Sequence, residues 1–268
     1  MQRILLCLPV FFIHPIQSKP GHRQSPIDIP RQAEHPLQFG AAYSQPIQAH
    51  LHRTEHGVCV DVPAKKDLIV RGLGLPAQGY HLRQFHFHWS PEDSAGSEHT
   101  LQGRHFPLEA HYVHLRSDLS SVEEALNSTE SDALAVIAVL FHITSDDAEK
   151  GDLSYLESGL VYKCPVSVTL AEELLVEGNF YRYQGSLTTP PYTESVLWTV
   201  FAEPRPVTRH QASFVLLTIS MPQASRNLAK MALLKLLRSL HINGSAADGG
   251  NWRPIQPLEG RNVTYLHN

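Results

Sequence analysis

The segment 134–141 has the sequence Leu-Ala-Val-Ile-Ala-Val-Leu-Phe and contains no polar side chain. A strand with one face in water would alternate apolar and polar residues, because successive side chains of a strand point to opposite faces. A run without a polar face is typical of a strand that is covered on both sides. The sequence therefore predicts a central β-strand here, inside a larger sheet.

Other segments of the chain show strand or helix patterns. Apolar stretches broken by Gly, Pro and Asp predict strands over 58–62, 67–72, 81–89, 107–116, 134–143, 181–184 and 194–201. Helical patterns are shorter and cover 120–126, where Ser-Ser-Val-Glu-Glu suggests a capping box, as well as 168–176 and 223–240. These patterns predict an α+β chain dominated by β-structure.

The length and charge of the chain limit its organisation and partners. The 268 residues contain no Gly/Ser linker, charge block or internal repeat, which favours a single domain. The net charge is −4 and the lysines are scattered, which argues against a nucleic-acid partner.

Two of the predicted strands carry histidines in alternation. Gln84, His86 and His88 share one face of the first strand, and Glu109 and His111 share a face of the second. Three imidazoles that converge from neighbouring strands, each beside a polar side chain, predict a zinc site with an open fourth position. The alternative is a half-buried strand with hydrogen-bonded histidines, and a chain with 17 histidines offers many such coincidences.

Six motifs in a fixed order connect the chain to a known family. The chain resembles the α-class carbonic anhydrases in Gln24-Ser25-Pro26-Ile27-Asp28-Ile29, Phe85-His86-Phe87-His88-Trp89, Gly96-Ser97-Glu98-His99-Thr100, Glu109-Ala110-His111-Tyr112-Val113-His114, Gly185-Ser186-Leu187-Thr188-Thr189-Pro190-Pro191 and Asn251-Trp252-Arg253-Pro254. The resemblance implies a single domain around a large, twisted, mainly antiparallel β-sheet with short peripheral helices. It also implies zinc-dependent, reversible hydration of carbon dioxide to bicarbonate and a proton, by attack of zinc-bound hydroxide.

The resemblance assigns roles around the metal. His86, His88 and His111 would hold Zn²⁺ through neutral nitrogens, and the ion would lower the pKa of a bound water to about 7, the value known for carbonic anhydrases. Gln84 and Glu109 would accept ring N–H groups from His86 and His111. The backbone carbonyl of Asn251 would do the same for His88. Such partners fix the tautomer and orientation of a ligand ring.

Three further residues would take part in the reaction. The Thr188 hydroxyl would donate a hydrogen bond to Glu98 and accept one from the zinc-bound hydroxide, thereby aiming a lone pair at the substrate. His56 falls at the position of the family's proton shuttle, although Glu55 stands where the family has glycine. By residue type alone, the loop around Thr188 would be ordinary, Glu98 would be a surface acid and His56 a surface imidazole.

The resemblance also implies an apolar wall that suits carbon dioxide, a small and uncharged substrate. Its residues, together with the neighbouring threonines, would be Val113, Leu134, Val136, Leu187, Thr188, Thr189, Val196 and Trp198. Val196 and Trp198 are two residues apart in a predicted strand, so both can face one cavity. Taken singly, each apolar residue has core packing as its alternative explanation.

The start of the chain and one internal segment depart from the family. Residues 1–18 have the basic start and apolar core of a signal peptide, with a mispredicted N-terminus as the alternative. Residues 19–265 would form the carbonic-anhydrase-like domain. Within it, an apparent insertion lies near 212–235.

The sequence features that bear on the cellular compartment disagree. The sequons at Asn127, Asn243 and Asn262 favour secretion, with a cytoplasmic location as the alternative. Of the three cysteines, only Cys59 and Cys164 remain to pair after removal of a signal peptide. We expect a monomer without a transmembrane span, acting on carbon dioxide and bicarbonate.

A non-catalytic binding or matrix protein on the same fold is the competing function. Three ligands are needed for a catalytic zinc site, and the chain keeps all three histidines. This favours the enzyme. A different zinc hydrolase is disfavoured because the chain has no His-Glu-x-x-His motif.

Overall fold

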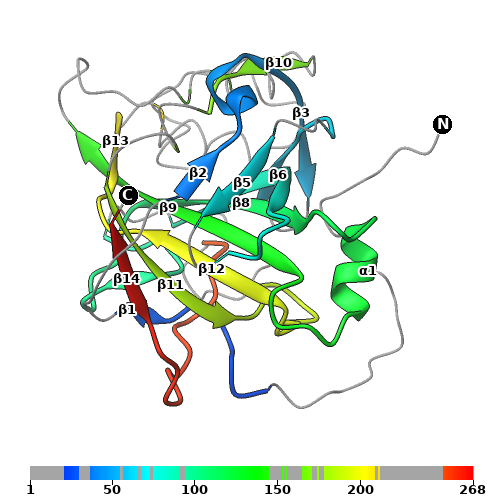
Figure 1. The fold of residues 1–268 in the computed structure, drawn as a ribbon. Helices are drawn as coiled ribbons and strands as arrows, with labels where there is room; N and C mark the ends of the chain where they lie inside the picture. Colours follow the sequence, from blue (N-terminus) through cyan, green and yellow to red (C-terminus); the bar gives the residue numbers. More distant parts are fainter. Residues whose placement is uncertain are drawn as a thin grey trace.

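The computed structural model describes residues 21–29, 37–54, 57–64, 68–72, 75–90, 94–144, 153, 155, 165–170, 174, 178–208, 211 and 250–267. Within these residues, a 12-stranded sheet forms the body of the molecule (Figure 1). Its main path runs through β10 (Val166–Val168), β3 (Ile47–Thr54), β4 (Gly57–Asp61), β6 (Tyr80–Trp89), β8 (Leu108–Arg116), β9 (Leu134–Thr144), β12 (Val196–Phe201), β11 (Asn179–Gly185) and β14 (Thr264–His267).

Most neighbouring strands in this sheet are antiparallel. The exceptions within it are β12 and β13 (Arg205–Thr208), which both pair in parallel with β9. Two short strands, β2 (Leu37–Phe39) and β5 (Ile69–Gly72), join through β6, and β1 (Asp28–Ile29) pairs separately with β7 (Thr100–Leu101). The prediction of a β-dominated fold around a large, mainly antiparallel sheet is confirmed.

Strand β9 occupies the central position that its apolar sequence predicts. It lies between β8 and β12, and residues 134–141 are all buried. Alternate side chains enter two separate apolar clusters: Ala135, Ile137, Val139 and Phe141 pack on one face, and Leu134, Val136, Ala138 and Leu140 on the other. Both faces are covered, which explains why the segment contains no polar residue.

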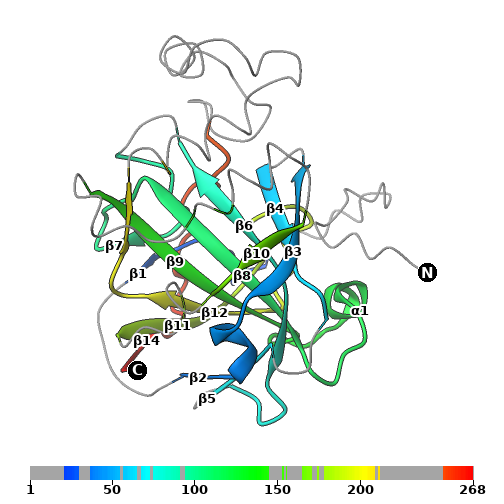
Figure 2. The ribbon, with the colours of Figure 1, turned by 90° about the horizontal axis from the view of Figure 1, so that it is seen from above.

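Helices are few and peripheral among the described residues. Helix α1 (Val122–Asn127) lies at the margin of the sheet in both views, and the Ser121 hydroxyl caps it by accepting from Glu124 N at 3.1 Å (Figures 1 and 2). A short 3-10 helix, η1, covers Ala41–Ser44. The Leu174 N–H donates to Leu170 O at 3.0 Å, a helical hydrogen bond inside the predicted helix 168–176.

Some predicted boundaries are wrong. Val168 ends strand β10 instead of beginning a helix, because it pairs with Ile47 on β3. The strands β1, β2, β3, β7, β10, β13 and β14 were not predicted from the sequence. The predicted helix 223–240 lies outside the described residues.

The register of the sheet places side chains from distant segments in transverse rows. One row contains His52 on β3, Cys59 on β4, His86 on β6, His111 on β8 and Ala138 on β9. Residues that pair across neighbouring strands project from the same face of a sheet. The histidines of two separate motifs are therefore neighbours on one surface.

Candidate metal centre

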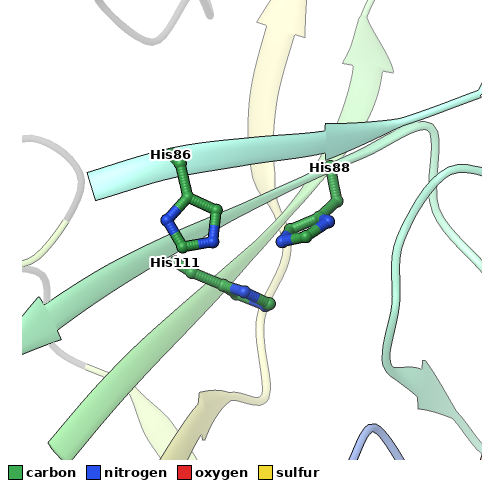
Figure 3. Close-up of side chains that lie close together, drawn as sticks. All are labelled: His86, His88 and His111. Carbon is green, nitrogen blue, oxygen red and sulfur yellow. The ribbon is translucent and has the colours of Figure 1, made fainter. Parts of the chain in front are cut away.

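Three imidazole rings converge on the face of the sheet formed by β6 and β8 (Figure 3). His86 and His88 project from the same side of β6, and His111 projects from the adjacent strand with its ring directed towards the other two. One ring nitrogen of each histidine lies within 4.8 Å of those of the other two. The geometry brings together three nitrogen donors around one point.

The other nitrogen of each ring contacts a polar acceptor. His86 Nδ1 lies 3.0 Å from Gln84 Oε1, His88 Nδ1 lies 2.9 Å from the backbone oxygen of Asn251, and His111 Nε2 lies 2.6 Å from Glu109 Oε1. These acceptors carry no proton to give, so the ring nitrogen beside each one donates. In a neutral imidazole the remaining nitrogen carries the ring's acceptor lone pair. These nitrogens are Nε2 of His86 and His88 and Nδ1 of His111.

Asn251 holds its carbonyl in place by pairing with the end of β6. Its side-chain amide accepts from Trp89 N at 2.8 Å and donates to Phe87 O at 2.9 Å. The side chain thus hydrogen-bonds the backbone on both sides of His88, as a neighbouring strand would. A residue 163 positions away in the sequence thereby orients a histidine of the central sheet.

Glu109 is a fully buried carboxylate between two imidazoles. Burial acts to raise its pKa, but the nearby His99 and His111 and their hydrogen bonds outweigh this effect and hold the pKa well below the ordinary value. Burial also lowers the pKa of His111, and neighbouring His88 lowers it further. A charged Glu109 beside a neutral His111 is the arrangement that a metal ligand requires.

A hydrogen-bonded chain extends from Glu109 into the core. His99 Nδ1 lies 2.6 Å from Glu109 Oε1, and its Nε2 lies 2.7 Å from the Tyr183 hydroxyl, which in turn contacts Ser25 Oγ at 3.1 Å. The roles of His99 and Tyr183 were not predicted. The sequence pointed to His99 solely through its place inside a family motif. The hydrogen-bonded chain could not be predicted, because its contacts join four distant segments.

Two buried atoms near the three histidines have no hydrogen-bond partner among the residues that the structure describes. They are His88 Nε2 and Glu98 Oε2, which lie 3.5 Å apart. Glu98 Oε2 is also 3.8 Å from His111 Nδ1, while its Oε1 accepts from Arg253 N at 2.7 Å. An unpartnered buried nitrogen that faces two others is the expected state of a metal ligand. The residues present therefore fit a zinc ion bound by three neutral imidazoles.

The predicted hydrogen bond between Thr188 and Glu98 is not formed in the structure. The carboxylate oxygen that would accept it, Oε2, is turned towards the facing nitrogens of His88 and His111. Thr188 nevertheless lies beside the histidines, because it lines the same cavity as His86 and His111. The two side chains are both at the site, without the direct contact expected.

A small cavity of about 40 Å³ opens beside the histidines. It is lined by Gln84, His86, His111, Val113, Val122, Leu134, Val136, Leu187, Thr188, Thr189 and Trp198. Val196 was predicted for this wall, but it is fully buried at the start of β12 and does not line the cavity. Val122 was not predicted as a lining residue, because it lies in the first turn of a helix and the prediction relied on the alternation of strand residues.

Several predicted features lie outside the described residues: His56, the segment 1–18 and the apparent insertion near 212–235. Cys59 is disulfide-bonded, and the other two cysteines of the chain lie outside the described residues. None of the helices in the described part of the chain is long and apolar enough to cross a membrane.

Comparison with known proteins supplies the family. The family model for eukaryotic-type carbonic anhydrase matches residues 14–267. The chain is 34% identical to putative carbonic anhydrase 5 of Caenorhabditis elegans over 75% of its length, and 37% identical to human carbonic anhydrase 12 over 71%. It spans only 58% and 56% of the length of these two relatives.

A third relative is matched nearly end to end. Putative carbonic anhydrase 3 of Caenorhabditis elegans is 32% identical over 92% of this chain and 91% of its own length. The family model covers almost the whole sequence, including all three histidines of the site. The chain therefore belongs to the eukaryotic-type carbonic anhydrase family.

Proposed function

We propose that the chain catalyses the reversible hydration of carbon dioxide to bicarbonate and a proton, with Zn²⁺ held by His86, His88 and His111. The observation that carries this proposal is the direction of the three rings. Each ring has its outer nitrogen hydrogen-bonded and its inner nitrogen facing the other two. When bound there, zinc supplies a Lewis acid that makes a coordinated water reactive towards carbon dioxide near neutral pH.

The chain's own residues give the site its charge balance. Three neutral ligands leave the full positive charge of the ion at the reacting centre, whereas a thiolate or carboxylate ligand would offset part of it. Gln84, Glu109 and the carbonyl of Asn251 keep the three rings in the required tautomer. Glu109 carries the charge that strengthens His111 as a donor.

Thr188 and Glu98 orient the nucleophile in this proposal. Glu98 Oε2 is a buried acceptor without a donor, and an unpaired carboxylate oxygen in a buried site is costly. The Thr188 hydroxyl lines the adjoining cavity and is the donor of suitable chemistry. Once it donates to Glu98, its oxygen can only accept from the reacting water, and this fixes where the water's lone pair points.

The cavity beside the histidines supports a very small substrate. Its volume, about 40 Å³, is far below the roughly 300–1,000 Å³ of pockets for drug-sized ligands. Val113, Leu134, Val136, Leu187 and Trp198 provide an apolar wall opposite the imidazoles. Carbon dioxide is uncharged and weakly hydrated, so it loses little by leaving water for such a wall.

We assign proton export to His56, because histidine is the side chain whose ordinary pKa lies near neutral pH. We further propose secretion as a monomer, with residues 1–18 as signal peptide and 19–265 as the catalytic domain, including the insertion near 212–235. The exposed sequon residues Asn127 and Asn262 support this location, because glycans are attached at the surface.

Stopped-flow hydration of carbon dioxide tests the proposal on zinc-loaded wild-type protein and two variants. His86→Ala should abolish turnover. His56→Ala should slow it in dilute buffer and recover in concentrated imidazole, which replaces the missing proton acceptor. Full activity of His86→Ala would overturn the metal assignment, and a His56→Ala variant as fast as wild type in dilute buffer would overturn the shuttle.

A further inference from the structure

A second group of possible metal ligands lies on the same face of the sheet, outside the three-histidine site. It consists of His52 on β3 and Cys59 and Asp61 on β4, whose ligand atoms all lie within 4.8 Å of one another. The mechanism proposed above uses none of these residues. We propose that His52, Asp61 and, once its disulfide is reduced, Cys59 bind a borderline divalent transition cation such as Zn²⁺.

The register of the sheet explains why these side chains meet. His52 pairs with Cys59 across β3 and β4, and Asp61 pairs with His50, two residues from His52. All four residues therefore point to the same face. Cys59 pairs in turn with His86 on β6, so the cluster continues the row that leads to the three histidines. Two strand spacings separate His52 from His86, which is about 10 Å.

The spacing between His52 and Asp61 fits two ligands of one ion. His52 Nδ1 lies 3.3 Å from Asp61 Oδ2, beyond the roughly 2.7–3.2 Å typical of an N–H···O hydrogen bond. Two ligands at about 2.0–2.1 Å from a tetrahedral zinc ion are about 3.3–3.4 Å apart. The cysteine sulfur lies 3.9 Å from Asp61 Oδ1. One ligand atom from each of the three groups lies within 4.8 Å of those of the other two, which is close enough for all three to contact one ion.

The surroundings of the cluster suit a cation. Burial raises the pKa of Asp61, whereas His52 and His50 act to lower it, so both imidazoles lie within electrostatic range of the carboxylate. His52 Nε2 is buried and has no hydrogen-bond partner among the described residues. The side chains of His52 and Asp61 are 30% and 23% exposed, which leaves a path for the ion from solvent.

The disulfide makes the site dependent on redox state. A disulfide sulfur cannot serve as a thiolate ligand, so the oxidised protein offers only His52 and Asp61 for tight coordination. A phosphine reductant gives two electrons to the disulfide and becomes a phosphine oxide with the oxygen of a water molecule, and the two protons of that water leave two protein thiols. Zinc binding then displaces the Cys59 proton and completes a set of sulfur, nitrogen and oxygen ligands.

Zinc content measured after gel filtration tests the site on the full chain. Wild type, His52→Ala, Asp61→Asn and Cys59→Ser are loaded with excess zinc with and without a phosphine reductant, and circular dichroism checks their fold. Without reductant, each should retain one zinc. With reductant, wild type should retain two and the three variants one. His22→Ala, at an exposed imidazole that contacts Glu259, is the matched control and should behave as wild type.

Two further measurements distinguish zinc bound at this cluster from zinc bound at the three-histidine site. His111→Ala should retain no zinc when oxidised and one when reduced. Co²⁺ in place of zinc should give a thiolate-to-metal charge-transfer band only in reduced protein that contains Cys59. The inference is overturned if reduced wild type retains a single zinc, or if His52→Ala and Asp61→Asn retain two. Failure of the proposed catalytic site would appear instead as oxidised wild type without zinc.

Discussion

Glu109 Oε1 lies 2.6 Å from His111 Nε2, and both residues are buried away from solvent. The same oxygen is 2.6 Å from His99 Nδ1, so one carboxylate fixes two rings at once. This contact couples the central sheet to the site, because it decides which nitrogen of His111 faces the other two histidines. Glu109 is therefore the residue through which the core orients His111.

Replacing Glu109 by Gln should weaken zinc binding by roughly 10–100-fold, because the amide lacks the charge that strengthens His111 as a donor. The measurement is competition with a chromophoric chelator at pH 7. Glu123→Gln, at an exposed position of α1, is the matched control and should leave affinity unchanged. Equal zinc affinity in Glu109→Gln and wild type would show that the contact has no part in metal binding.

Thr188 and Glu98 should behave as one unit in a double-mutant cycle. We expect Thr188→Ala to lower kcat/KM roughly 100-fold, because the reacting water loses its fixed orientation. Glu98→Gln should cost a similar factor. The double variant should lose little more than either single one, since each change removes the same arrangement. Losses that multiply in the double variant would mean that the residues act independently.

Catalysis should be sensitive to the size of the side chain at position 113, because Val113 lines the small cavity from β8. Val113→Phe fills a space of about 40 Å³ and should reduce kcat/KM for carbon dioxide without loss of zinc. Val113→Ala enlarges the same space and serves as the control for disturbance of the strand. Zinc content and carbon dioxide hydration are measured on the same samples. Undiminished hydration by Val113→Phe would place the substrate elsewhere.

His114 should make folding stability sensitive to acid. Burial lowers its pKa to about 3, from an ordinary value near 6.5. Between these values the unfolded chain binds a proton that the folded chain does not. Stability contributed by this neutral group is therefore complete above pH 6.5 and falls by about 1.4 kcal/mol per unit as pH decreases towards 3.

Urea denaturation between pH 4 and 7 measures this effect. His114→Gln is expected to be less stable than wild type at pH 7 but to show a flatter pH dependence, because the titrating group is gone. The exposed His22→Gln variant should keep the wild-type slope. If the slopes of His114→Gln and wild type coincide, the buried imidazole is not the source of the acid sensitivity.

The arrangement of the three histidines could be predicted from sequence because it depends on a local rule. Strand alternation put His86 and His88 on one face of one predicted strand and His111 on a face of the next. The central position of β9 followed equally from its lack of polar residues. Both predictions required only the two-residue period of a strand.

Other parts depend on contacts between distant segments and could not be predicted this way. The register of β3 against β4 and β6 brings His52, Cys59 and His86 into one row, although β3 itself was not predicted. Val196 has the same spacing to Trp198 as Leu134 has to Val136, yet only Trp198 of its pair reaches the cavity. Alternation gives the face of a residue, whereas access to a cavity depends on what covers that face.

Zinc titration of the metal-free protein, with carbon dioxide hydration measured at each step, tests the central claim most directly. The rate should rise in proportion to added zinc and reach a plateau at one equivalent per chain under non-reducing conditions, while His111→Ala stays flat. Hydration by the metal-free protein, or a fully loaded protein without activity, would contradict the account.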